Sequence, residues 1–125
     1  MDFLDEAAGV VFVGMPDVQR DFGISTAMGM VVAFTLPGVV ATLLEPPLLL
    51  LADRYPLRRK AFVVAGLVTF GVSLGAAALA PHPSLFALAM GAMFVANGLG
   101  VNLAQATLMD ADPERREVWM TRWVL

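Results

Sequence analysis

The sequence has 125 residues, of which 58% are hydrophobic and 15% are charged. Soluble domains are about 45–50% apolar and about 25% charged, and a soluble domain of this length cannot cover so much apolar surface with so few polar groups. The net charge is −3, so there is no basic field to attract nucleic acid. The absence of cysteine excludes disulfides, thiolate metal sites and thiol catalysis.

The first hydrophobic stretch is too short to cross a membrane. Residues 7–15 are apolar and would form about 14 Å of helix, roughly half a crossing. Asp2, Asp5 and Glu6 precede them, so the acidic start does not resemble a secretory signal, which begins with basic residues. We expect a partial span over about residues 3–16.

Three long apolar runs follow, at residues 27–52, 61–80 and 85–109. As helices they would be about 39, 30 and 38 Å long, enough to cross a hydrocarbon core of about 30 Å. Glu45 is the only charged residue in them. Since none of the runs alternates polar and apolar residues as a barrel strand does, the sequence predicts three complete transmembrane helices.

The basic residues lie in the segments that connect these runs. Residues 53–60 read DRYPLRRK and residues 110–122 read DADPERREVWMTR, and together they hold seven of the eight Lys and Arg residues, whereas the turn PHPS at 81–84 holds none. Short basic loops mark the cytoplasmic side. We therefore expect an integral protein of the plasma membrane with loops 53–60 and 110–122 in the cytoplasm, and another span that starts at residue 123.

Small residues recur at every fourth position in two of the runs. Gly71 and Gly75 form a GxxxG pattern in the second run, and the third run carries Ala92, Ala96, Gly100 and Ala104. Helices in lipid approach each other closely where small residues meet. We predict helix packing at Gly71, Gly75, Ala96 and Gly100.

A few polar side chains fall inside the apolar runs. Glu45 is a candidate for proton coupling or substrate contact, although a structural hydrogen bond to a neighbouring helix is an equal alternative, because an ionised carboxylate in hydrocarbon costs about 3 kcal/mol or more. Asn97, Asn102 and Gln105 share an arc of about 140° on one helix. They are candidates for lining a proton or substrate pathway, or else for hydrogen bonds between helices.

Catalytic patterns are missing from the sequence. It contains no Walker lysine motif, no HExxH and no nucleophile elbow, and it has one histidine. A protein metal site is not expected with so few ligands. We predict no catalytic residues, no cofactor and no metal, and therefore that the protein is not an enzyme.

The first basic loop resembles the signature G-x-L-A-D-R-x-G-R-[KR] of the major facilitator superfamily, which joins the second and third helices of those transporters. Five residues match the signature: Leu51, Ala52, Asp53, Arg54 and Arg58. Leu49, Pro56 and Leu57 stand where the two glycines and the first trailing basic residue of the signature are expected. Aligning the basic end of the signature one residue later would imply a lengthened loop in this chain.

Other stretches are similar to the same family. Residues 4–25 look like the end of its first helix and the following loop, and Glu45 with Pro46 resembles a pair found late in its second helix. Residues 97–100 and 112–116 resemble its fourth helix and the next loop. Phe94 occupies a position where many members carry an arginine.

The resemblance implies an all-α membrane protein with a partial bundle: half of helix 1, complete helices 2 to 4 and the onset of helix 5. It also implies transport of a small molecule by alternating access, with Asp53, Arg54 and Arg58 as a gating loop and protons as a candidate coupling ion. On this view the partners are the lipid bilayer, an unknown substrate and a missing carboxy-terminal half. The alternative is a small membrane scaffold or inactive remnant that transports nothing; a membrane-embedded enzyme ranks last.

Overall fold

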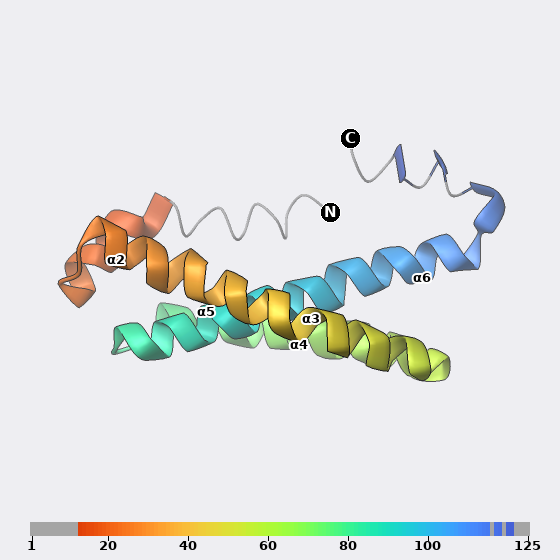
Figure 1. Cartoon of the computed structure of the whole chain (residues 1–125), viewed down its shortest axis with the longest axis horizontal. Helices are drawn as coiled ribbons and strands as arrows, with labels where there is room; N and C mark the ends of the chain where they lie inside the picture. The colour runs from red at the N-terminus through yellow and green to blue at the C-terminus, as the bar shows by residue number, and fades with distance from the viewer. Residues whose placement is uncertain (1–12, 116, 119, 122–125) are drawn as a thin grey trace.

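The computed structural model describes residues 13–115, 117–118 and 120–121 of the chain, and these contain helices and turns but no strand (Figure 1). A helical segment over residues 13–22 comes first. The remaining elements, in chain order, are α2 (Thr26–Met30), η1 (Val31–Thr35), α3 (Leu36–Arg54), η2 (Pro56–Arg58), α4 (Arg59–Ala78), α5 (Pro83–Asn97), η3 (Gly98–Asn102), α6 (Leu103–Ala111) and η4 (Pro113–Arg115).

Within the described residues, three continuous helical stretches are long and apolar enough to cross a membrane. They are Thr26–Arg54, Pro56–Ala78 and Pro83–Ala111, and at 1.5 Å per residue they are about 44, 35 and 44 Å long. The predicted segments 27–52 and 85–109 lie inside the first and third stretches, whereas 61–80 extends two residues past the end of α4. Most of the predicted partial span 3–16 and the predicted span start at 123 lie outside the described residues.

Local signals in the sequence explain where the helices begin. Gly23 adopts a left-handed conformation with φ of 62°, which allows the chain to reverse after residue 22. Ser25 then caps α2, because its hydroxyl oxygen accepts a hydrogen bond from the Met28 amide at 3.2 Å. Pro83 starts α5, where the missing N–H of proline costs nothing.

Two of the three spans contain a π-helical turn. The turn η1 precedes Pro37, and the Leu36 amide donates to the Val31 carbonyl, five residues back. Pro37 has no N–H to donate to the Ala33 carbonyl, so the α-helical pattern is interrupted there. The second π turn, η3, starts at Gly98 and joins α5 to α6. It widens the third span in the region of the predicted polar pathway.

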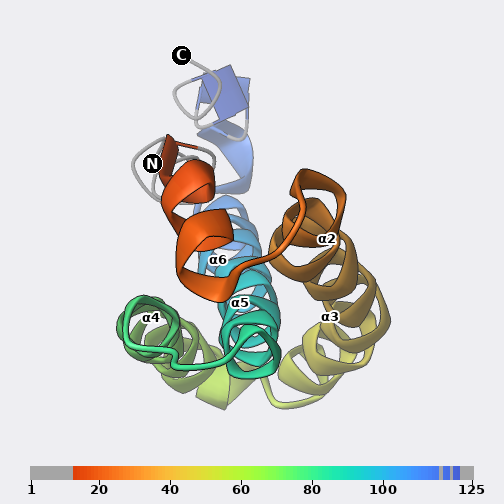
Figure 2. The same ribbon diagram turned by 90° about the vertical axis from the view of Figure 1, so that its left-hand side faces the viewer.

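The third span lies at the centre of the bundle. Half of an 18-residue apolar stretch within it is buried, against 28% of such a stretch in the first span and 22% in the second. In Figure 2, α4 and α3 lie on either side of α5, and the segment 13–22 lies across the same helix. Large apolar side chains on the outer faces of α3, α4 and α5 are exposed, among them Leu43, Leu50, Val72 and Leu88. Such faces suit a lipid environment.

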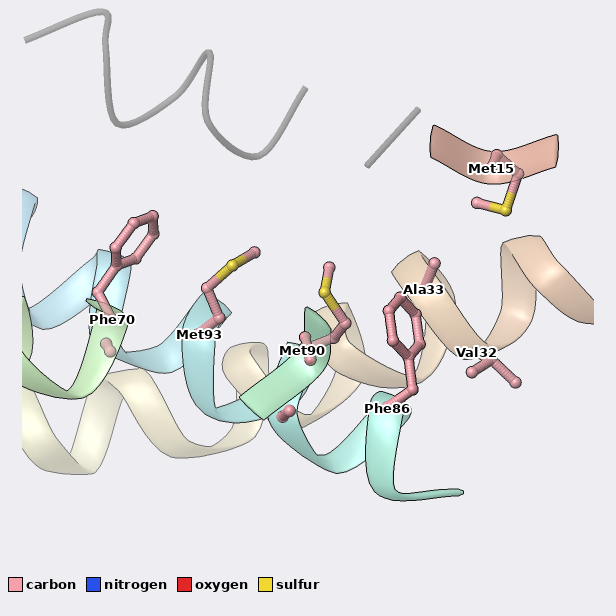
Figure 3. Close-up of a cluster of buried hydrophobic side chains, with 10 residues drawn as sticks. Met15, Val32, Ala33, Phe70, Phe86, Met90 and Met93 are labelled. Carbon is pink, nitrogen blue, oxygen red and sulfur yellow. The ribbon is translucent and has the colours of Figure 1, made fainter. Parts of the chain in front are cut away.

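The core is a row of aromatic and methionine side chains along α5. Figure 3 shows Met90 and Met93 between Phe70 of α4 and Phe86, with Val32 and Ala33 from the first span at the Phe86 end. Met90 and Met93 are at most 1% exposed. Methionine is flexible and fills irregular gaps between helices, so it suits a core where three helices meet around a widened turn.

Candidate functional site

Three charged side chains meet where the first two spans are joined. Arg59, the first residue of α4, donates to Asp53 near the end of α3 at 2.6 Å and to Asp110 near the end of α6 at 2.7 Å. The Arg59 side chain is 21% exposed, whereas those of Asp53 and Asp110 are more than half exposed. One guanidinium therefore joins the ends of all three spans. We call Asp53, Arg59 and Asp110 the three-charge cluster.

The turn between the first two spans brings Arg59 into this position. The 3-10 turn η2 starts at Pro56, and the Arg58 amide donates to the Tyr55 carbonyl at 2.9 Å. This tight turn starts α4 immediately after Arg58. Arg59 then lies on the side of α4 that packs against the third span, while Arg54 and Arg58 remain exposed.

Of the three predicted gating residues, only Asp53 lies in the three-charge cluster. Neither Arg54 nor Arg58 forms an ion pair with a described acid. Sequence reasoning did not single out Arg59 or Asp110. Two signals in the sequence could have indicated these residues. The loop between Asp53 and the basic residues is longer than in the signature, which moves the basic end toward Arg59. Asp110 directly follows a long uncharged run, and so lies at the end of a span.

Glu45 is a half-buried residue of α3 and its carboxyl group lies against Gly98 of the third span. A Cβ at position 98 would overlap this group, so only glycine leaves room for the carboxyl in its present place. Among the described residues, no hydrogen bond or ion pair is found for Glu45. The carboxyl therefore lies between two spans, next to the π turn η3, without a fixed described partner.

The other predicted polar residues are spread around the same π turn. Asn97 ends α5, and its Oδ1 atom is buried with no hydrogen-bond donor among the described residues. Asn102 is exposed at the end of η3, and Gln105 is half-buried in α6. Because a π turn holds more residues than an α turn, the α-helical spacing that predicted a common arc does not apply between Asn97 and Asn102.

The predicted small-residue contacts are also only partly brought together. A Cβ added at Gly71 or Gly75 would meet no described neighbour on another helix within 4 Å. The close contact of α4 uses Gly66 instead: a Cβ there would lie 2.8 Å from the Gly100 nitrogen and 3.1 Å from the Ala96 carbonyl oxygen. Ala96 and Gly100 are thus in a tight helix contact, and their partner is a glycine that the sequence pattern did not indicate.

The described residues contain no group of three His, Asp or Glu side chains that could hold a metal ion. The chemistry available at these positions is charge pairing at the ends of the spans and a carboxyl group between two spans.

Comparison with known proteins identifies the family. Among curated proteins and among solved structures, none matches the chain significantly. The sequence model described as Major Facilitator Superfamily matches residues 3–125, almost the whole chain. With its three membrane-spanning helices and its charged loop, the chain is an all-α membrane protein that belongs to the major facilitator superfamily of transporters.

Proposed function

We propose that this chain forms part of a secondary transporter that moves a small molecule across the plasma membrane by alternating access. Such transporters open a central site first to one side of the membrane and then to the other, as two halves rock against each other. The second half of the transporter is a partner that this mechanism requires. Loops 53–60 and 110–122 lie in the cytoplasm on this proposal, in agreement with their excess of arginine and lysine.

The observation that carries the proposal is the three-charge cluster. Asp53 and Asp110 are the next-to-last residues of α3 and α6, and the helix dipole favours cations at this end of a helix. Arg59 is the first residue of α4, where the helix dipole favours anions. Each charge is thus disfavoured by its own helix end. Helix capping does not account for such a placement, whereas a bond that holds three helix ends together does.

In the proposed cycle the cluster acts as a latch. While Arg59 binds both acids, the ends of the three spans are fixed relative to one another. A conformational change that draws Asp53 toward another cation or helix end would weaken one of these bonds and release the other. Since a latch of this kind biases an equilibrium between two states, its loss would change the rate of transport rather than the folding of the chain.

Glu45 is the candidate for proton binding or substrate contact. Its carboxyl lies between α3 and the π turn η3, against Gly98, and π turns inside helices are frequent at functional sites. A carboxyl within a membrane span that has no cationic partner is a functional-site hypothesis by default. Asn97, Asn102 and Gln105 lie on the adjoining part of the third span and are candidates to line the same pathway.

Transport by the complete gene product in proteoliposomes tests this function. An imposed pH gradient, a pH-sensitive dye inside the vesicles and a panel of amino acids, sugars, organic anions and organic cations would detect solute-dependent proton movement. Radiolabelled solutes would detect transport that does not move protons. We expect at least one solute to be taken up in a saturable manner. A protein that is well folded in the vesicles and takes up no solute of any class would contradict the proposal.

A further inference from the structure

An apolar groove runs along the outside of the bundle, and neither the three-charge cluster nor Glu45 is among the residues that line it. In Figure 2, α4 and α3 flank α5, and the groove lies between these two helices with α5 as its floor. Its volume is about 340 Å³. Val40 and Leu44 of α3 form one wall, and Phe62, Ala65 and Thr69 of α4 form the other.

The length of the groove matches one leaflet of a bilayer. Its floor extends along the third span from Ala87 to Leu99, a rise of about 18 Å at 1.5 Å per residue. Half of a hydrocarbon core about 30 Å thick is about 15 Å. The wall and floor residues belong to the three membrane spans, so a lipid acyl chain in the bilayer can reach the groove.

The end of the groove toward η2 carries a cation. Arg58 precedes Phe62 by one helical turn on the same side of α4, about 6 Å further along the axis. Arg58 is exposed, and its backbone amide donates to the backbone carbonyl of Tyr55, a residue that is 48% exposed. Tyrosine is enriched at the membrane interface, where its hydroxyl meets the headgroups. An exposed arginine and a partly exposed tyrosine therefore belong to the turn next to this end of the groove.

The charges around this turn favour an anionic headgroup over a zwitterionic one. Arg59 is already bound to two carboxylates, whereas no described acid forms an ion pair with Arg54, Arg58 or Lys60.

We propose that the groove binds one acyl chain of an anionic phospholipid whose phosphate is held by Arg58. The chain lies along α5 between Phe62 and Val40, and the guanidinium of Arg58 donates to the phosphate oxygens. Lys60 serves as an internal comparison, because it follows Arg58 by two residues and points to the opposite side of α4. The assignment depends on neither the transported substrate nor the direction of insertion.

Lipid retained by the purified protein tests the proposal. The complete gene product is reconstituted in vesicles of equal parts phosphatidylglycerol and phosphatidylcholine, extracted in a mild nonionic detergent, and examined by native mass spectrometry. We expect bound phosphatidylglycerol to exceed phosphatidylcholine. The variant Arg58→Gln should lower this preference about five-fold, as removal of one interfacial cation predicts, while Arg58→Lys should retain part of it and Lys60→Gln should leave it unchanged.

A second pair of variants tests the acyl chain. Ala65→Phe places a ring in the groove and should reduce bound lipid of both kinds, whereas Val64→Phe, on the side of α4 away from the groove, should not. Size-exclusion profiles establish that each variant is folded. Equal retention of the two lipids by the unaltered protein would overturn the proposal. It would also be overturned by equal losses in Arg58→Gln and Lys60→Gln, or by displacement of the lipid with soluble glycerol phosphate.

Discussion

Arg59 and Asp110 are 51 positions apart in the sequence, and their side chains are joined by a hydrogen bond of 2.7 Å. This bond connects the first residue of α4, in the second span, with the end of the third span. Because Arg59 also binds Asp53 at 2.6 Å, the three spans are held at one end by a single side chain.

Loss of the bond between Arg59 and Asp110 should slow transport without preventing folding. We expect Asp110→Asn to reduce the transport rate about five-fold or more, the low end of typical coupling between two states. Arg59→Gln should slow transport at least as much, because it also removes the bond to Asp53. The double variant should be no slower than Arg59→Gln alone, since the bond that Asp110→Asn removes is then already lost. The measurement is uptake into proteoliposomes at equal protein content.

The neighbouring pair of Asp112 and Arg115 provides the matched control. These residues lie in the same loop at 3.8 Å, three positions apart and exposed, so Asp112→Asn should leave transport unchanged. If Asp112→Asn slowed transport as much as Asp110→Asn, general loop charge rather than the three-charge cluster would be responsible.

Replacement of Gly66 by alanine should destabilise the bundle. The added methyl group would lie 2.8 Å from a backbone nitrogen of the third span, so α4 and η3 would have to separate, at a cost of about 1–3 kcal/mol. The apparent melting temperature of the detergent-purified protein should fall. Gly71→Ala adds the same methyl group to the same helix where nothing lies within 4 Å, and its melting temperature should not fall. Equal behaviour of the two variants would show that α4 does not pack through Gly66.

Replacement of Gly98 by alanine should act through Glu45. The methyl group would overlap the end of a flexible side chain rather than backbone, so the carboxyl moves and the fold is retained. We therefore expect Gly98→Ala to resemble Glu45→Gln in transport, with stability close to that of the unaltered protein.

The pH dependence of transport is the readout for Glu45. If the carboxyl takes up a proton during the cycle, Glu45→Gln should abolish the pH dependence and Gly98→Ala should shift or weaken it, while Gly38→Ala, at an open position of α3, should not. An unchanged pH profile in Glu45→Gln would remove Glu45 from the coupling mechanism.

The spans were predictable because their signal is long and local. Each needs about 20 consecutive apolar residues, and a run of that length can be recognised without knowing what it packs against. The turn at Gly23 and the start of α5 at Pro83 also follow from single residues whose backbone preferences are strong.

The contacts between the spans were less predictable, because they depend on how each helix is rotated about its axis. Gly66 and Gly71 are both small residues of α4, but only Gly66 faces η3. Arg58 and Arg59 are adjacent and chemically identical, and the tight turn η2 decides which of them meets the acids. The π turn at Gly98 rotates the residues after it, so Asn97 and Asn102 could not be placed from α-helical spacing.

Cysteine labelling can establish how the chain is threaded through the membrane. This chain has no cysteine, so Leu57→Cys, His82→Cys and Glu114→Cys can be introduced singly into a gene product free of other cysteines and exposed to a membrane-impermeant maleimide in sealed cells. Only His82→Cys should react, and the other two should react after the membrane is permeabilised. Labelling of Leu57→Cys in sealed cells, or of only one of Leu57→Cys and Glu114→Cys, would contradict the account.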